Sequence, residues 1–186
     1  MKTWWCGVAL AALAAAAPVA GEDSTRYWTS PDWDVDAYAD HCMATTVSEL
    51  KEDGLSVFGV YYAAEDKYLS VNFSSPVTSS LKEDDKVTAE LLFASTKRNE
   101  VDDGWGSPEF TVTKMDGGST LFVLKIKADA VQTMLDDISA NDYVALQKNE
   151  TIFAGAQLDG SAQAMKQLKA CAFGIAGLNP RDPFAQ

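Results

Sequence analysis

The feature that most constrains the fold is a series of short segments in which apolar and polar residues alternate. In one of them Leu69, Val71 and Phe73 fall on one face of an extended strand, and the serine and asparagine residues between them fall on the other. Lys86–Ala94 alternates in the same way. Leu55–Ala63 is apolar on both faces, which is typical of a strand buried on both sides. These patterns predict a β-sheet packed on an apolar core.

Turn signals between these segments predict that the sheet is mainly antiparallel. Ala64–Lys67 separates two predicted strands, and Asp116–Gly118 lies between two more. An Asp-Gly pair is a strong hairpin signal because both turn positions tolerate positive φ. A further hairpin is predicted to turn at Lys148–Glu150. Successive hairpins build a sandwich or a strongly curved sheet.

Two segments change to a helical period. The first has apolar residues at i, i+3, i+4 and i+7, and they are Val131, Met134, Leu135 and Ile138. In the second, Ser161 is predicted as the N-cap and Gly177 as the stop. Its apolar stripe comprises Met165, Leu168, Ala172 and Ile175. The chain is therefore predicted to be α+β, a mainly antiparallel sheet with two covering helices.

The first twenty residues read as an export signal. Lys2 precedes an apolar run that ends at Val19 and Ala20, directly before a charged segment, which is typical of a cleaved secretory leader. An uncleaved membrane anchor is the alternative, but the run is shorter than the roughly 20 residues that usually span a bilayer. We expect a leader at 1–20, a polar lead at 21–30, one domain at 31–177 and a flexible tail at 178–186. Localisation is then periplasmic or secreted.

Removal of the leader leaves two cysteines, Cys42 and Cys171. Two lone cysteines in an oxidising compartment most often pair, so we expect a disulfide. The loop it closes spans 129 positions. In the chain-entropy model such a loop stabilises by about 5 kcal/mol.

The acidity of the chain restricts its partners. Without Lys2, 14 basic and 27 acidic side chains remain, a net charge of −13. That field repels nucleic acid and anionic lipid. We expect a protein or glycan partner, no nucleic acid and no membrane insertion after cleavage. The oligomeric state is left open.

The stretch Thr151–Cys171 resembles the closing segment of small exported bacterial proteins of the invasion-associated locus B type. There a strand leads through a glycine-containing turn into a helix, and the pattern is matched here by Leu158, Gly160, Ser161, Ala164 and Leu168. The resemblance implies a predominantly β fold and a role in host-cell colonisation. It carries over no catalytic residues.

The stretch Pro31–Cys42 contains several aspartates, the single histidine of the chain and a cysteine. Its opening matches a calcium loop at Asp32, Asp34 and Asp36. An EF-hand also needs glycine at position six and glutamate at twelve, where this chain has Ala37 and Met43. Alternation predicts instead a strand with Trp33 and Val35 facing inward and the aspartates facing water. We expect no metal site here and no cofactor.

His41 is the only imidazole, so any Ser-His-Asp or Cys-His mechanism has to use it. Its neighbour Cys42 is expected to be oxidised, and adjacent side chains on a strand point to opposite faces. We therefore expect a surface histidine beside a disulfide and no catalytic residue. A role in sensing acid is the alternative.

The most site-like loop contains Asp102, Asp103 and Trp105, with a glycine on either side of the tryptophan. An aromatic side chain on such a loop is suited to contact a partner or a glycan. The alternative is that Trp105 folds back as a lid on the sheet. We expect a non-enzymatic binding domain, with the three residues as candidate binding residues. The alternative function is a small hydrolase that uses carboxylates such as Asp102 and Asp103.

Overall fold

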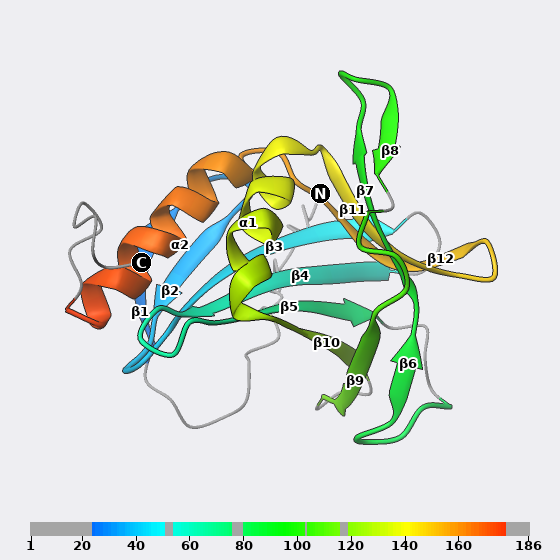
Figure 1. The fold of residues 1–186 in the computed structure, drawn as a ribbon, viewed down its shortest axis with the longest axis horizontal. Coiled ribbons are helices and arrows are strands. Elements are labelled where there is room, and N and C mark those ends of the chain that lie inside the picture. The colour runs from blue at the N-terminus through cyan, green and yellow to red at the C-terminus, as the bar shows by residue number, and fades with distance from the viewer. Residues whose placement is uncertain (1–23, 51–53, 76–79, 103, 116–118, 178–186) are drawn as a thin grey trace, which may run out of the picture.

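The structure, a computed structural model, describes residues 24–50, 54–75, 80–102, 104–115 and 119–177. Within these ranges the chain forms two antiparallel sheets, one short 3-10 helix and two α-helices (Figure 1). This arrangement confirms the predicted α+β class. The leader at 1–20 and the tail at 178–186 lie outside the described residues.

The larger sheet has eight strands in the order β1-β2-β3-β4-β5-β10-β9-β6, and every neighbouring pair is antiparallel. Its strands are β1 (Thr25–Thr29), β2 (Asp34–Ala37), β3 (Cys42–Leu50), β4 (Gly54–Ala63), β5 (Tyr68–Ser75), β6 (Lys86–Thr88), β9 (Glu109–Lys114) and β10 (Thr120–Ile126). Strand β1 lies within the segment predicted as a polar lead. Among the described strands it is an edge strand of the larger sheet, and its mostly polar side chains carry no clear apolar alternation.

The smaller sheet has four strands in the order β12-β11-β7-β8. They are β7 (Glu90–Ser95), β8 (Glu100–Asp102), β11 (Tyr143–Lys148) and β12 (Thr151–Gln157). The turn between β11 and β12 places Asn149 and Glu150 at φ 50° and 64°, which confirms the predicted hairpin. The β4–β5 hairpin is also confirmed, whereas the turn at 116–118 lies outside the described residues.

The segment Lys86–Ala94, predicted as one strand, is divided between the two sheets. Strand β6 ends at Thr88, and β7 begins at Glu90 and pairs with β11 and β8. The alternation continues across the corner, because Val87, Ala89 and Leu91 are all buried. Alternation reports which side chains face the core. It does not report which strands pair, so the corner could not be predicted from it.

Three serine hydroxyls join β12, at the edge of the smaller sheet, to the larger sheet. Ser75 Oγ donates to the Phe153 carbonyl oxygen at 2.7 Å, and Ser48 Oγ accepts from the Gln157 amide at 3.0 Å. Ser56 Oγ lies 3.5 Å from the Gly155 amide. These contacts bring β12 across β3, β4 and β5, so the two sheets enclose one core.

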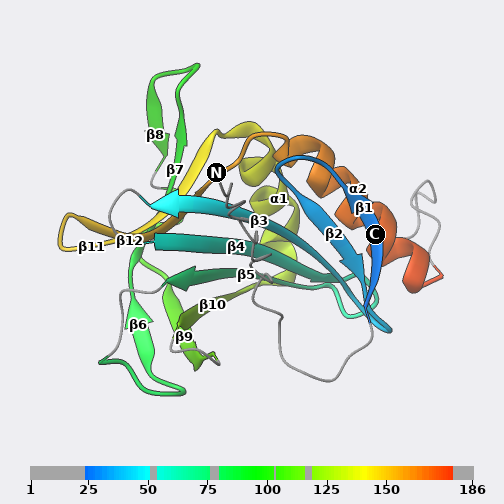
Figure 2. The ribbon, with the colours of Figure 1, turned by 180° about the vertical axis from the view of Figure 1, so that it is seen from behind.

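Both helices lie on the same face of the larger sheet, as the opposite views in Figures 1 and 2 show. They are α1 (Val131–Ala140) and α2 (Ser161–Ile175), and the 3-10 turn η1 (Ala128–Ala130) leads into α1. All four apolar residues predicted for α1 are buried. In α2, Met165, Leu168 and Ala172 are buried, and Gly177 at φ 66° follows its end.

Ser161 does not cap α2 as predicted. Gly160, at φ 78°, occupies the N-cap position, and no side-chain cap bond is present. The Ser161 hydroxyl instead donates to the Ile138 carbonyl oxygen of α1 at 2.7 Å. The packing of α1 against α2 offers this buried hydroxyl an acceptor that the local sequence does not reveal.

The predicted disulfide is present between Cys42 and Cys171, whose sulfur atoms lie 1.98 Å apart. It joins the first residue of β3 to α2, and both cysteines are buried. The bond therefore ties the second helix to the sheet beneath it.

The core lies between the helices, the smaller sheet and the inner face of the larger sheet. The bulkiest side chains buried there are Trp33, Phe58, Phe73, Phe93, Phe110 and Phe122.

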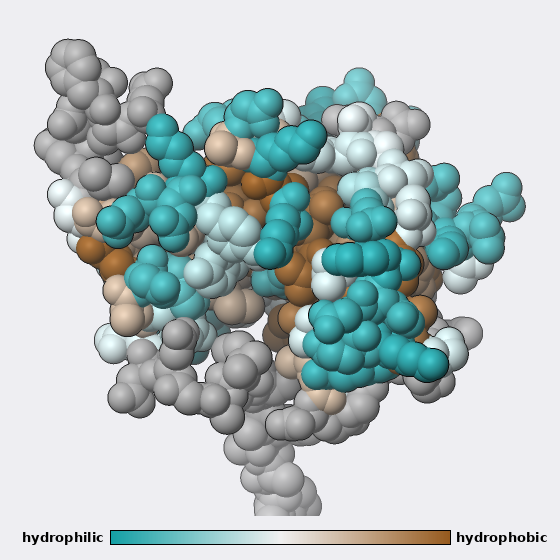
Figure 3. Space-filling model, turned by 60° about the horizontal axis from the view of Figure 1, so that its bottom comes forward, coloured by the Kyte–Doolittle hydropathy of each residue, from teal (hydrophilic) through white to brown (hydrophobic). Residues whose placement is uncertain are grey.

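Strand β4 was predicted to be buried on both faces, but Leu55 on its outer face is 53% exposed. The rest of that face is covered in part, since Val57 and Tyr61 are half-buried and Ala63 is buried. Figure 3 shows the underside of the molecule, where hydrophobic surface is visible between hydrophilic clusters.

Candidate functional site

The loop that carries Trp105 lies against the corner between the two sheets. The Leu91 amide donates to the Gly106 carbonyl oxygen at 3.0 Å, and the Ala89 amide donates to the Pro108 carbonyl oxygen at 3.3 Å. Gly106 has φ 59°, a conformation that favours glycine. The corner therefore fixes the backbone on which Trp105 is mounted.

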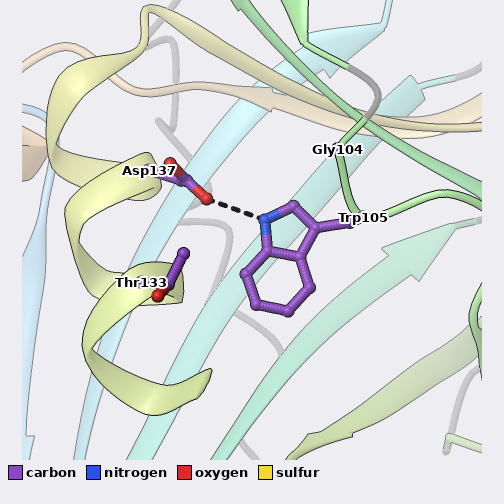
Figure 4. Close-up of a pocket in the computed structure, with 4 residues that line it drawn as sticks. All are labelled: Gly104, Trp105, Thr133 and Asp137. Carbon is purple, nitrogen blue, oxygen red and sulfur yellow. Dashed lines mark hydrogen bonds between the residues drawn. The ribbon is translucent and has the colours of Figure 1, made fainter. Parts of the chain in front are cut away.

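Trp105 folds back toward α1 instead of standing clear of the sheet. Its ring is half-buried and packs against the edge of the core. Its Nε1 donates a hydrogen bond of 2.8 Å to Asp137 Oδ2 (Figure 4). Of the two alternatives that the sequence left open, the structure shows the folded-back one. The indole N–H has found a partner, as is usual for a partly buried tryptophan.

A pocket of about 300 Å³ opens between this loop and α1. It is lined by Gly104, Trp105, Thr133 and Asp137 (Figure 4). Thr133 and Asp137 are one helical turn apart, so both project from the same side of α1. An aromatic surface, a hydroxyl and a carboxylate therefore meet in one open surface pocket. This set can pack against the apolar part of a ligand and accept hydrogen bonds from its donors.

Thr133 and Asp137 were not predicted as site residues. Both lie on the polar side of an amphipathic helix, where the sequence pattern is the same for a solvated face and for the wall of a pocket. No local signal marks them, because their proximity to Trp105 depends on the β8–β9 loop.

The structure does not place the other two candidate binding residues. Asp102 ends strand β8, but its side chain lies outside the described part of the chain, and so does Asp103. Their contribution to binding, or to a carboxylate-dependent hydrolase, stays a prediction.

The aspartates of Pro31–Cys42 are partly engaged by a basic side chain. Trp33 and Val35 are buried as predicted, and Asp32 is exposed. Asp34 and Asp36, however, both pair with Arg26 on the neighbouring strand β1, with Nε of Arg26 2.7 Å from Asp36 Oδ1. The hydrogen bond to Asp36 and the charges of both carboxylates raise the pKa of the Arg26 guanidinium. Cross-strand pairing therefore neutralises part of this acidic face.

His41 is buried, which corrects the prediction of a surface histidine. Its imidazole is stacked between the rings of Tyr38 and Tyr61, and Nδ1 lies 2.6 Å from Asp40 Oδ1. Cys42 points into the core on the other face of the sheet, as expected for neighbouring strand residues. The burial comes from tyrosines on the β2–β3 loop and on β4, which the local sequence does not bring together.

Within the described residues, no group of three or more His, Cys, Asp and Glu side chains is placed to hold a metal ion. Neither helix in those ranges is long and apolar enough to cross a membrane.

Comparisons with protein-family models, with curated proteins and with solved structures find no match to this chain. The pocket beside Trp105 is accordingly interpreted from its own residues.

Proposed function

We propose that this chain is an exported, non-enzymatic binding domain whose protein or glycan ligand contacts the pocket beside Trp105. The observation that carries the proposal is the placement of the Trp105 ring and the Asp137 carboxylate in one cavity, held by their 2.8 Å hydrogen bond. Tryptophan is enriched among the residues that dominate binding energy at interfaces. A ring that is already positioned loses little conformational freedom when a ligand binds.

Two observations support export. The first twenty residues have the composition of a cleaved leader. Cys42 and Cys171 form a disulfide, and disulfides persist in oxidising compartments. The resemblance of Thr151–Cys171 to invasion-associated locus B proteins favours a role at the cell envelope or toward a host.

The proposal is tested with the mature chain, beginning at Gly21 and purified from the compartment into which it is exported. The immobilised chain captures its partner from an extract of that compartment, and the bound material is compared with that of Trp105→Ala. We expect capture to weaken tenfold or more, because the wall of the pocket is lost.

The matched control is Trp28→Ala, a half-buried tryptophan on β1 at the far edge of the larger sheet. It should retain capture. Urea unfolding of both variants separates lost binding from lost folding. Equal capture by Trp105→Ala and the wild type would refute the proposed site.

A further inference from the structure

We propose that the pocket selects a cation, namely the arginine side chain of a protein partner. This inference rests on the proposed function of the pocket as a binding site. It adds the chemical class of the ligand, which the cavity, the carboxylate and the indole indicate together.

The size of the pocket favours a single side chain as its occupant. Its volume of about 300 Å³ is at the lower limit of the roughly 300–1,000 Å³ that is usual for small-molecule sites. The pocket is also shallow and widely open to solvent. A cavity of this kind suits an extended side chain that enters from a partner's surface.

The charge at the pocket favours a positive group. Among the described residues, the Asp137 carboxylate accepts a hydrogen bond from Trp105 and has no basic side chain within ion-pair distance. Asp137 also lies in the C-terminal half of α1, whose last turn contains no basic residue. The helix dipole there adds negative potential and favours a cation.

Arg98 does not supply the missing charge. It is the basic side chain hydrogen-bonded at the C-terminal end of α1, where its Nη1 donates to the Ala140 carbonyl oxygen and its Nη2 donates to Asn141 Oδ1. Its Nε pairs with Glu100 at 3.0 Å. These three contacts hold the guanidinium at the helix end and leave Asp137 for an incoming cation.

The indole favours arginine over other cations. A guanidinium within about 6 Å of an indole centroid is attracted to its π-face, and arginine occurs in such pairs more often than lysine. The guanidinium is planar, so it can lie on the ring of Trp105 while an N–H group donates to Asp137. The Nε1 bond to Asp137 Oδ2 fixes the ring and the carboxylate relative to each other. The hydroxyl of Thr133, one turn before Asp137, offers a further acceptor.

The experiment follows the Trp105 indole N–H resonance of the mature chain by NMR, assigned through Trp105→Phe. The ligands are N-acetyl-arginine amide, the isosteric but neutral N-acetyl-citrulline amide, N-acetyl-lysine amide and the neutral disaccharide cellobiose. We expect arginine to shift the resonance and citrulline to bind at least tenfold more weakly, since it has no charge. Asp137→Asn should weaken arginine binding by a similar factor.

The matched control is Asp136→Asn, because the neighbouring carboxylate accepts from Gln132 Nε2 at 2.7 Å and does not line the pocket. Arginine binding by this variant should equal that of the wild type. Four results would each overturn the inference. Two concern the charge: the Asp136 and Asp137 variants lose arginine binding equally, or the citrulline compound binds as tightly as the arginine compound. The other two are tighter binding of lysine than of arginine, and no shift of the resonance with arginine up to its solubility limit. Binding of cellobiose alone would also overturn it, but it would leave the pocket as a site. If partner capture is also insensitive to Trp105→Ala, the proposed function itself is wrong.

Discussion

The imidazole of His41 lies nearly parallel to the ring of Tyr61, with a centroid separation of 4.1 Å and an interplanar angle of 25°. Tyr38 stacks on the imidazole at 4.4 Å and 8°. Only 7% of His41 is exposed. The single histidine of the chain is therefore a packing residue on the outer side of the larger sheet.

Replacement of His41 by alanine is expected to destabilise the fold by about 1–3 kcal/mol, because each stacked aromatic pair contributes roughly 0.5–1.5 kcal/mol beyond the buried area. Urea unfolding of the mature chain measures the change. Tyr27→Ala is the control, since Tyr27 is exposed on β1 and its loss should change stability by less than about 0.5 kcal/mol. An unfolding curve for His41→Ala that matches the wild type would contradict the buried position of His41 and favour a surface position.

The mature chain, purified without reductant, is expected to contain no free thiol. Cys42 and Cys171 are bonded and buried, so a thiol probe should react only after reduction in denaturant. Mass spectrometry of the alkylated protein gives the count. About two reactive thiols per chain before reduction would contradict the disulfide.

Loss of that disulfide in a Cys42→Ser, Cys171→Ser double variant should lower the free energy of unfolding by about 2–5 kcal/mol. Two effects contribute: the unfolded chain regains the freedom of a loop of 129 positions, and α2 loses its covalent bond to β3. Thermal unfolding of the double variant beside the oxidised wild type measures the loss. Equal melting temperatures would show that packing alone holds α2 on the sheet.

Gly155 is expected to tolerate no side chain. A Cβ atom there would lie 2.8 Å from the Val144 carbonyl oxygen on β11, and backbone cannot move aside as a flexible side chain can. Gly155→Ala should cost about 1–3 kcal/mol. Gly174→Ala is the matched control: that glycine is in α2 with nothing within 4 Å, so alanine should stabilise by up to about 1 kcal/mol. Similar effects of the two changes on urea unfolding would contradict the close contact between β11 and β12.

Asp142 is expected to contribute stability that disappears in acid. The hydroxyl and the amide of Thr96 donate to its carboxylate and hold its pKa below the ordinary 3.8. The native state therefore favours the ionised form, so the contribution is complete above the unfolded pKa and is lost as the pH falls through the lower native value. The stability gap between the wild type and Asp142→Asn should narrow below about pH 4.

Urea unfolding at a series of pH values measures this gap. Asp66→Asn, at an exposed position in the β4–β5 turn, is the control for the general effect of removing one negative charge. A gap for Asp142→Asn that stays constant from about pH 7 to about pH 3 would contradict the assignment.

Local patterns in the sequence were sufficient for both helices and most of the longer strands, and for many of their buried faces. The alternation at Leu69, Val71 and Phe73 and the stripe of α1 both place side chains that are buried in the structure. Such patterns are informative because the side-chain periods of strands and helices are fixed by the backbone. The Cys42–Cys171 bond was predictable for another reason, since only two cysteines follow the predicted leader and they allow only one pairing within a chain.

Beyond the hairpins, the tertiary structure alone decided which elements meet. The division of one alternating segment at Ala89, the bond from Ser161 to α1 and the stacking of His41 between two tyrosines all depend on contacts between distant segments. The pocket has the same origin: its tryptophan and its carboxylate are 32 positions apart and meet because the sheet corner orients the β8–β9 loop toward α1. Periodicity fixes the direction of a side chain relative to its own element, whereas a site requires the relative position of two elements, which the packing of the whole core sets.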